Sequence, residues 1–244
     1  MRTMIWAHRG ASAYAPENTM EAFQLAHKMG ADGIELDVHV TKDGHVVVCH
    51  DETVDRCSGG SGRIIDKTLQ ELLSLDFSNG KEKYAETRIP TLEQVLTFIK
   101  DSGMTLNIEL KSGVILYEGI EEKTLNLVSK YGLDDKIIYS SFNHYSLATI
   151  KKLNPQAKIG LLYGEAMVDP YVYARHLHAA AIHPYYPTLR VPGTVEGCQS
   201  QGIKVHPWTV DQRDHILWML KEKVDAIITN YPDIAVELRK SVQK

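Results

Sequence analysis

Two acidic residues and a histidine are spaced so that a hairpin would bring their side chains together. Glu35 and Asp37 are two residues apart in one apolar run, and His50 ends a second apolar run that follows Asp43-Gly44. Asp-Gly between two such runs favours a two-residue hairpin turn, because both central residues of a type I′ turn need a positive φ. That turn places His50 opposite Asp37, and the alternation of side chains along a strand puts Glu35 on the same face. We therefore expect two carboxylates and an imidazole to share a small volume.

A cluster of this kind could hold a metal ion. Two carboxylates at close range resist ionising together unless a positive charge lies between them. Mg²⁺ and Ca²⁺ prefer such oxygen ligands, whereas zinc prefers nitrogen and sulfur. A hairpin with solvated acids on its exposed face has the same spacing, so both interpretations stay open for this motif alone.

Other polar residues stand near the ends of predicted strands. His8 and Arg9 end the first apolar run, and Glu109 and Lys111 are two residues apart, so that they share a face of a later strand. Arginine and lysine suit a phosphate group, and an imidazole can take up or release a proton near neutral pH. Together with the acids of the hairpin, these residues indicate metal-assisted hydrolysis of a phosphate ester. The further polar strand ends are Ser140-Ser141, His183 and His206.

The segment before the first predicted helix carries two more residues of interest. Asn18, with Glu21 three residues later, fits the start of a helix, and we interpret it as a helix cap. Glu17 has no such explanation. We expect Glu17 to brace Arg9 or His8 beside the substrate.

The elements that must position these residues alternate along the chain. Strands that can be parallel begin near residues 4, 33, 104, 137, 158, 179, 204 and 226. Helices are expected over 20–29, 68–75, 91–100, 116–131, 143–153, 170–177, 194–201, 212–223 and from 232. Alternating strands and helices predict parallel strands with helical crossovers, and eight such strands close an α/β fold of the (β/α)8, or TIM, barrel type. In such a barrel the functional residues lie at the carboxyl ends of the strands.

Length and composition agree with one domain. The 244 residues suit a single barrel domain over 1–244, with the hairpin and a loop-rich insertion at about 51–90 after the second barrel strand. We expect the insertion to act as a lid. The net charge of −4 argues against a nucleic-acid partner, whose binding surface would be basic.

Cysteine usage and hydropathy bear on the compartment. Three cysteines without metal-binding spacing favour a reducing environment, and no apolar leader is visible at the N-terminus. No run approaches the roughly 18 apolar residues of a membrane span. We therefore expect a cytoplasmic protein without stable membrane insertion, and the sequence leaves open whether it forms a homodimer.

Several short motifs, taken in order, resemble one known family. They are Ala7-His8-Arg9-Gly10, Pro16-Glu17-Asn18-Thr19, Glu35-Leu36-Asp37-Val38, His50-Asp51, Asn107-Ile108-Glu109-Leu110-Lys111, Trp208-Thr209-Val210 and Asp225-Ala226-Ile227-Ile228-Thr229-Asn230-Tyr231-Pro232. Across nearly the whole chain the sequence resembles the glycerophosphodiester phosphodiesterases, in particular their short cytoplasmic bacterial type. The resemblance implies a TIM barrel with a small insertion after the strand that carries His50.

The resemblance also implies roles for the site residues. One divalent cation, Mg²⁺ or Ca²⁺, would be held by Glu35, Asp37 and Glu109. His8 would act as general base and His50 as general acid. The reaction would convert a glycerophosphodiester and water into an alcohol and glycerol 3-phosphate.

Further residues complete this implied site. Arg9 and Lys111 would contact the phosphate. We expect Trp208 to pack against the glycerol or the alcohol, although a tryptophan of the core fits its position equally well. The attacking oxygen could be that of water or the glycerol 2-hydroxyl.

Two other functions stay open from the sequence. A lysophospholipase D-type phosphodiesterase would use similar residues on a long-chain substrate, and its apolar contacts could come from Leu116, Tyr117 and Tyr171–Tyr173. A non-catalytic module that binds phosphorylated polyols is the other alternative. Such a module would need neither paired histidines nor a metal site.

Overall fold

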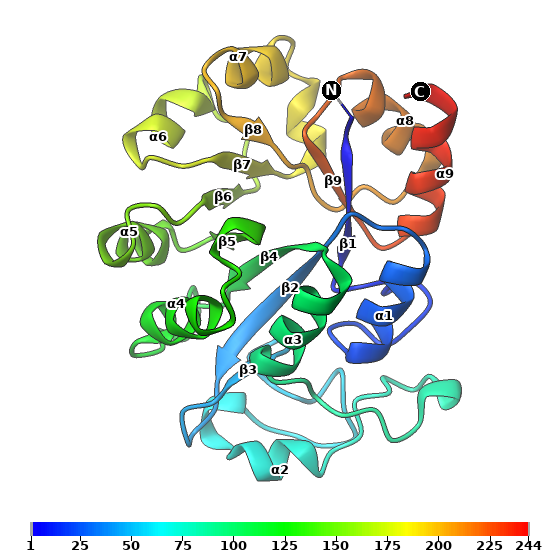
Figure 1. Cartoon of the computed structure of the whole chain (residues 1–244), viewed down its shortest axis with the longest axis vertical. Coiled ribbons are helices and arrows are strands. Elements are labelled where there is room, and N and C mark those ends of the chain that lie inside the picture. The colour runs from blue at the N-terminus through cyan, green and yellow to red at the C-terminus, as the bar shows by residue number, and fades with distance from the viewer. Residues whose placement is uncertain (1, 244) are drawn as a thin grey trace.

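Eight parallel strands form a nearly closed barrel in the computed structural model, which describes residues 2–243 (Figure 1). Hydrogen bonds join the strands in the order β8-β7-β6-β5-β4-β2-β1-β9, and β3 pairs antiparallel with β2. Backbone bonds from Asp225 N to Val205 O and from Ile228 N to Pro207 O, each 3.0 Å, link the β8 segment to the β9 segment. The predicted TIM barrel is therefore confirmed. The strands are β1 Met4–His8, β2 Gly33–Val40, β3 Val46–Val48, β4 Thr105–Leu110, β5 Ile137–Ser141, β6 Ile159–Tyr163, β7 Ala181–Pro184, β8 Lys204–Val205 and β9 Ala226–Thr229.

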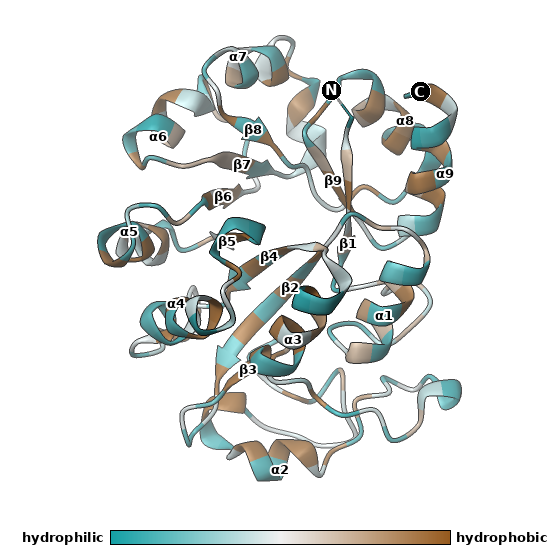
Figure 2. Cartoon of the chain, in the orientation of Figure 1, coloured by the Kyte–Doolittle hydropathy of each residue, from teal (hydrophilic) through white to brown (hydrophobic). Residues whose placement is uncertain are grey.

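Helices surround the barrel, and most show one apolar and one hydrophilic side (Figure 2). The α-helices are α1 Met20–Lys28, α2 Leu69–Leu73, α3 Leu92–Ser102, α4 Ile120–Tyr131, α5 His144–Leu153, α6 Pro170–His176, α7 Thr194–Ser200, α8 Arg213–Lys221 and α9 Pro232–Val242. The predicted start of α4 at Leu116 is wrong, because Gly119 precedes the helix with a φ of 72°. In residues 2–243 we find no helix with both the length and the apolar character that a bilayer crossing requires.

The hairpin of β2 and β3 has a different register from the one we predicted. Val38 lies opposite Val48, and Cys49 N donates to Asp37 O, so Cys49 and not His50 is opposite Asp37. The reason is a three-residue loop that ends at Gly44 with a φ of 88°, in which Gly44 N donates to Thr41 O. Loops of this length commonly end in a left-handed glycine. His50 nevertheless reaches the barrel mouth, because the chain has left the ladder by that point.

Residues 51–90 leave the barrel between β3 and α3 and cover the outer side of the hairpin (Figure 1). They contain α2 and the short 3-10 helices η1 Ile64–Asp66 and η2 Glu82–Tyr84. A second hydrophobic cluster ties this insertion to the hairpin. Its buried members are Val47, Cys49, Val54, Cys57, Ile64, Leu72, Phe77 and Ile89. That the chain is a single domain with this insertion remains our prediction, as does the action of the insertion as a lid.

Two histidines that we placed at the barrel rim lie instead in its buried interior. The rings of His183 and His206 are 4.9 Å apart, and Trp6 packs edge-on against His206 at 4.7 Å. Nδ1 of His206 lies 3.0 Å from Nε2 of His183. Burial lowers the pKa of His183 to about 3 and also lowers that of His206, so both rings are neutral. They pack the interior and take no part in the polar group at the rim.

We expect Gly160→Ala to destabilise the protein, because a Cβ there would lie 2.3 Å from Nε2 of His183, whose fully buried ring packs against His206. Overpacking of this kind costs about 1–3 kcal/mol. Gly164→Ala is the matched control, since a Cβ at that position has no atom within 4 Å. Thermal unfolding should show a lower Tm for Gly160→Ala only, and equal Tm values would contradict this account of the interior.

Candidate active site

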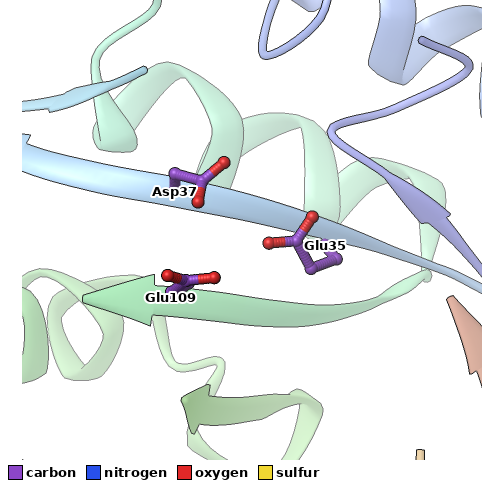
Figure 3. Close-up of side chains that lie close together, drawn as sticks. All are labelled: Glu35, Asp37 and Glu109. Carbon is purple, nitrogen blue, oxygen red and sulfur yellow. The ribbon is translucent and has the colours of Figure 1, made fainter. Parts of the chain in front are cut away.

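The pairing of β2 with β4 brings three acids together at the carboxyl end of the barrel (Figure 3). Asp37 is the register partner of Glu109, and Glu35 stands two residues before Asp37 on the same face. One carboxylate oxygen from each acid lies within 4.8 Å of the others. The three side chains are buried, with exposed fractions of 4% for Glu35, 0% for Asp37 and 8% for Glu109.

Burial and mutual repulsion shift the ionisation of these acids. Burial, together with the charge of Asp37, raises the pKa of Glu109 to about 7 and raises that of Glu35 as well. Burial also acts to raise the pKa of Asp37, but the charges of Arg9 and Lys111 outweigh it and bring that pKa to about 2. The cluster therefore carries a firm negative charge on Asp37 and two carboxyl groups that are costly to ionise without further positive charge.

This donor set fits a hard divalent cation. Among the described residues, the buried Oδ1 of Asp37 has no hydrogen-bond partner, and neither has Oδ1 of the neighbouring Asn107. Buried polar atoms are nearly always bonded, so these oxygens point to a ligand. Carboxylate oxygens on a buried face are what Mg²⁺ and Ca²⁺ prefer. Glu35, Asp37 and Glu109 could therefore bind a metal ion.

Arg9 and Lys111 both contact the acids. Arg9 Nε lies 3.4 Å from Asp37 Oδ2, and Lys111 Nζ lies 3.0 Å from Glu109 Oε1 and 3.7 Å from Asp37 Oδ1. Arg9 has a φ of 55°, an uncommon conformation for a residue with a side chain. Its backbone N donates to the side-chain Oε2 of Glu35 at 3.0 Å, which holds that conformation. Both cations are thus available to a phosphate beside the acid cluster.

Asn18 belongs to this site and is not a helix cap. Thr19 caps α1, because its side chain accepts from Ala22 N. Asn18 instead has a φ of 57° and donates from Nδ2 to Asp37 Oδ2 at 2.9 Å. The helix begins at Met20 as predicted, but Thr19 caps it, which releases the Asn18 side chain toward the acids.

A pocket with an empty volume of about 440 Å³, partly open to solvent, lies over the acid cluster. It is lined by His8, Arg9, Glu35, His50, Asn107, Glu109, Lys111, Phe142, Leu162, Trp208, Thr209 and Ile228. His8 and His50 therefore meet in one pocket, as predicted. Burial and the charge of Arg9 lower the pKa of His8 to about 4.

A chain of ion pairs connects His50 to Arg9 through the insertion. His50 Nδ1 donates to Asp51 Oδ1 at 2.6 Å, and Arg56 Nε donates to Asp51 Oδ2 at 2.7 Å. Arg56 also donates to both oxygens of Glu17 at 2.8 Å, and Glu17 in turn accepts from Arg9 at 3.0 Å. Glu17 braces Arg9, as expected. The sequence held no signal for Arg56, which reaches the site from the insertion.

One wall of the pocket is aromatic. The ring of Trp208 packs against Phe142 at 5.5 Å and against Tyr185 at 5.6 Å. Its Nε1 donates to His183 O at 2.7 Å, which fixes the orientation of the ring. Trp208 therefore both packs against the scaffold and lines the pocket.

The structure brings together every site residue that the sequence predicted, with Glu17 held just behind Arg9 and Asp37 beneath the pocket surface. Several neighbours were missed. Asn107 could have been found, since it stands two residues before Glu109 and so shares its face. The other residues that the sequence analysis did not assign to the site are Asn18, Arg56, Phe142, Asp211 and Asn230.

Comparisons with known proteins show the family to which this chain belongs. The chain matches the glycerophosphoryl diester phosphodiesterase family over residues 8–234. It is 48% identical to a glycerophosphodiester phosphodiesterase of Caldanaerobacter subterraneus over 239 residues, which cover 98% of each chain. It is 34% identical to a glycerophosphodiester phosphodiesterase of Bacillus subtilis, over 98% of this chain and 87% of that one. A solved Oleispira antarctica phosphodiesterase, in complex with the product sn-glycerol-3-phosphate, superposes with a TM-score of 0.89 at 29% identity and covers 98% of this chain and 97% of that one.

We expect Mg²⁺ or Ca²⁺ to raise the Tm of the protein, because an ion held by these three acids would bind only the folded chain, which brings them together. A free concentration about 100 times the Kd would stabilise the fold by about 2.7 kcal/mol. Scanning calorimetry with added metal or chelator measures the shift at constant ionic strength. Glu109→Gln should shrink it, whereas Glu93→Gln on the surface should not. A Tm that stays the same when either ion is added would contradict the metal site.

Proposed function

Because the chain belongs to the glycerophosphoryl diester phosphodiesterase family and is a glycerophosphodiester phosphodiesterase, we propose that it uses one divalent cation to hydrolyse small glycerophosphodiesters to an alcohol and glycerol 3-phosphate. The observation that carries this proposal is the buried group of Glu35, Asp37 and Glu109 beneath a pocket that also holds two histidines. The sn-glycerol-3-phosphate bound to the Oleispira phosphodiesterase supports the choice of product.

The acids and the two basic side chains would bind different parts of the reacting complex. Glu35, Asp37 and Glu109 would hold Mg²⁺ or Ca²⁺, which supplies positive charge against the phosphate. Arg9 and Lys111, which both line the pocket, bind the phosphate oxygens. Glu17 does not line the pocket but holds the Arg9 guanidinium in place, so its part in substrate binding is indirect.

His8 and His50 supply the acid–base chemistry. One ring removes the proton of the attacking oxygen, and the other protonates the departing alcohol. Trp208 and Phe142 form the wall against which the glycerol or the alcohol packs. The attacking oxygen is that of water or of the glycerol 2-hydroxyl.

A lysophospholipase D-type reaction is the second candidate, and one observation favours it. Val114 and Leu116, in the loop after β4, have exposed fractions of 78% and 79% and could contact a long acyl chain. Tyr117, which we expected to help, is instead buried and donates to Nδ1 of His39 at 2.8 Å. Of the other residues that we expected to help, Val172 is 61% exposed, whereas Tyr171 and Tyr173 pack against the core. The short-chain substrate is our first proposal, because the pocket has an empty volume of about 440 Å³.

The cytoplasm is our proposed compartment. Cys49, Cys57 and Cys198 are free thiols, which accords with a reducing environment.

We expect His8→Ala and His50→Ala each to lower kcat by roughly 10²- to 10⁴-fold, because each variant removes one proton-transfer group. Release of glycerol 3-phosphate from glycerophosphocholine measures the effect, and His45→Ala, outside the pocket, is the control. Near-normal turnover in either of the two variants would refute its acid–base role.

A substrate panel tests the proposed function directly. Glycerophosphocholine should be hydrolysed faster than lysophosphatidylcholine, because a pocket with an empty volume of about 440 Å³ suits the smaller substrate. A strong chelator should stop both reactions, and added Mg²⁺ or Ca²⁺ should restore them. Faster turnover of the long-chain substrate would favour the lysophospholipase D-type reaction, and full activity under chelation would remove the metal from the proposal.

A further inference from the structure

The two histidines of the pocket are held through the same ring atom by partners of different chemistry. Nδ1 of His8 lies 2.7 Å from Oδ1 of Asn230, and Nδ1 of His50 lies 2.6 Å from Oδ1 of Asp51. The carboxylate of Asp51 can only accept, so Nδ1 of His50 carries a proton. The amide of Asn230 could present either its oxygen or its nitrogen, so its orientation must follow from its other contacts.

Asp211 fixes the orientation of that amide. The group next to Asp211 Oδ2, at 2.6 Å, must be the Asn230 nitrogen, because a carboxylate only accepts. Asp211 cannot easily turn away, since its Oδ1 accepts from the backbone N of Asn230 at 2.9 Å and from Thr229 Oγ1 at 3.1 Å. The amide oxygen therefore faces His8.

The tautomer of His8 follows from this arrangement. An amide oxygen accepts, so Nδ1 of His8 must carry the proton of the neutral ring. Nε2 is then unprotonated, and it lies 3.9 Å from Glu35 Oε2 on the side of the acid cluster. A ring held in this form can take a proton at Nε2 but has none to give there.

We propose that Asp211 and Asn230 are positioning residues that hold His8 in the tautomer with its proton on Nδ1, so that Nε2 is free to take the proton of the attacking oxygen, an inference that rests on the proposed function. As the oxygen of the attacking hydroxyl bonds to phosphorus, its proton passes to Nε2 of His8. The bond from phosphorus to the alcohol oxygen breaks with its electron pair, and His50 gives that oxygen a proton. One proton is gained and one is lost, and exchange with solvent restores both rings.

The two rings have partners of different charge, because Asp51 is a carboxylate and Asn230 is a neutral amide. Neither Asp211 nor Asn230 lines the pocket, so both act on the substrate only through His8.

The leaving group separates the two roles. We would compare glycerophosphocholine with the p-nitrophenyl ester of glycerol 3-phosphate, whose nitrophenolate departs without a proton. Asp211→Asn lets the Asn230 amide turn over, and we expect kcat to fall about 10- to 100-fold on both substrates with KM nearly unchanged. His50→Ala and Asp51→Asn should lose activity on glycerophosphocholine only. Asp214→Asn is the matched control, because it makes the same substitution at an aspartate in the first turn of α8.

A spectroscopic readout accompanies the kinetics. ¹⁵N NMR of labelled histidine should show the Nδ1–H tautomer of His8 in the wild type and a mixture in Asp211→Asn, while thermal melts report whether each variant is folded. If Asp211→Asn lacks a stable fold, Asn230→Ala serves in its place and should lose activity on both substrates.

Two results would overturn the inference. The first is a wild-type kcat of Asp211→Asn on both substrates. The second is a wild-type kcat of Asp211→Asn or Asn230→Ala on the nitrophenyl ester. Failure of the proposed function looks different, because the wild type would then hydrolyse neither ester while the tautomer of His8 could still be measured.

Discussion

The close approach of three buried acids is the constraint on which the rest of the site depends. Parallel pairing of β2 with β4 places Asp37 beside Glu109, and the two-residue period of a strand adds Glu35 on the same face. Buried negative charges at this range are unfavourable unless positive charge compensates them. The compensation explains why Arg9 and Lys111 converge on the cluster. A bound cation would also satisfy Oδ1 of Asp37, which has no hydrogen-bond partner among residues 2–243.

The need to compensate the negative charge of Asp37 also explains the conformation of the loops around the barrel mouth. Arg9 and Asn18 both have positive φ values, which cost energy, and both direct their side chains at Asp37. Glu17 then holds Arg9, and Arg56 joins Glu17 to the Asp51 partner of the second histidine. The insertion is thereby coupled to the acid cluster through charge as well as through its own hydrophobic cluster.

The sequence predicted what depends on local pattern and missed what depends on long-range contacts. Strand positions and the pairs Glu35–Asp37 and Glu109–Lys111 follow from alternation, so the barrel and the acid cluster could be predicted. Our prediction of the hairpin register was wrong because Asp-Gly occurs in both two-residue and three-residue hairpin loops. Arg56 and Asp211 could not be assigned, because their partners lie far away along the chain and no periodicity links them.

The two proton-transfer groups stand on structurally different supports. His8 ends a barrel strand, and its Nδ1 partner Asn230 follows the neighbouring strand β9, so this side is fixed by the ladder of β1 and β9. His50 lies where the chain leaves the ladder of β2 and β3, and its support comes from Asp51 and from Arg56 of the insertion. On the proposed mechanism the attacking oxygen therefore meets the side built on barrel strands, and the leaving alcohol meets the insertion. Changes in residues 51–90 could then alter which alcohol is accepted while the attack geometry, set by β1 and β9, stays the same.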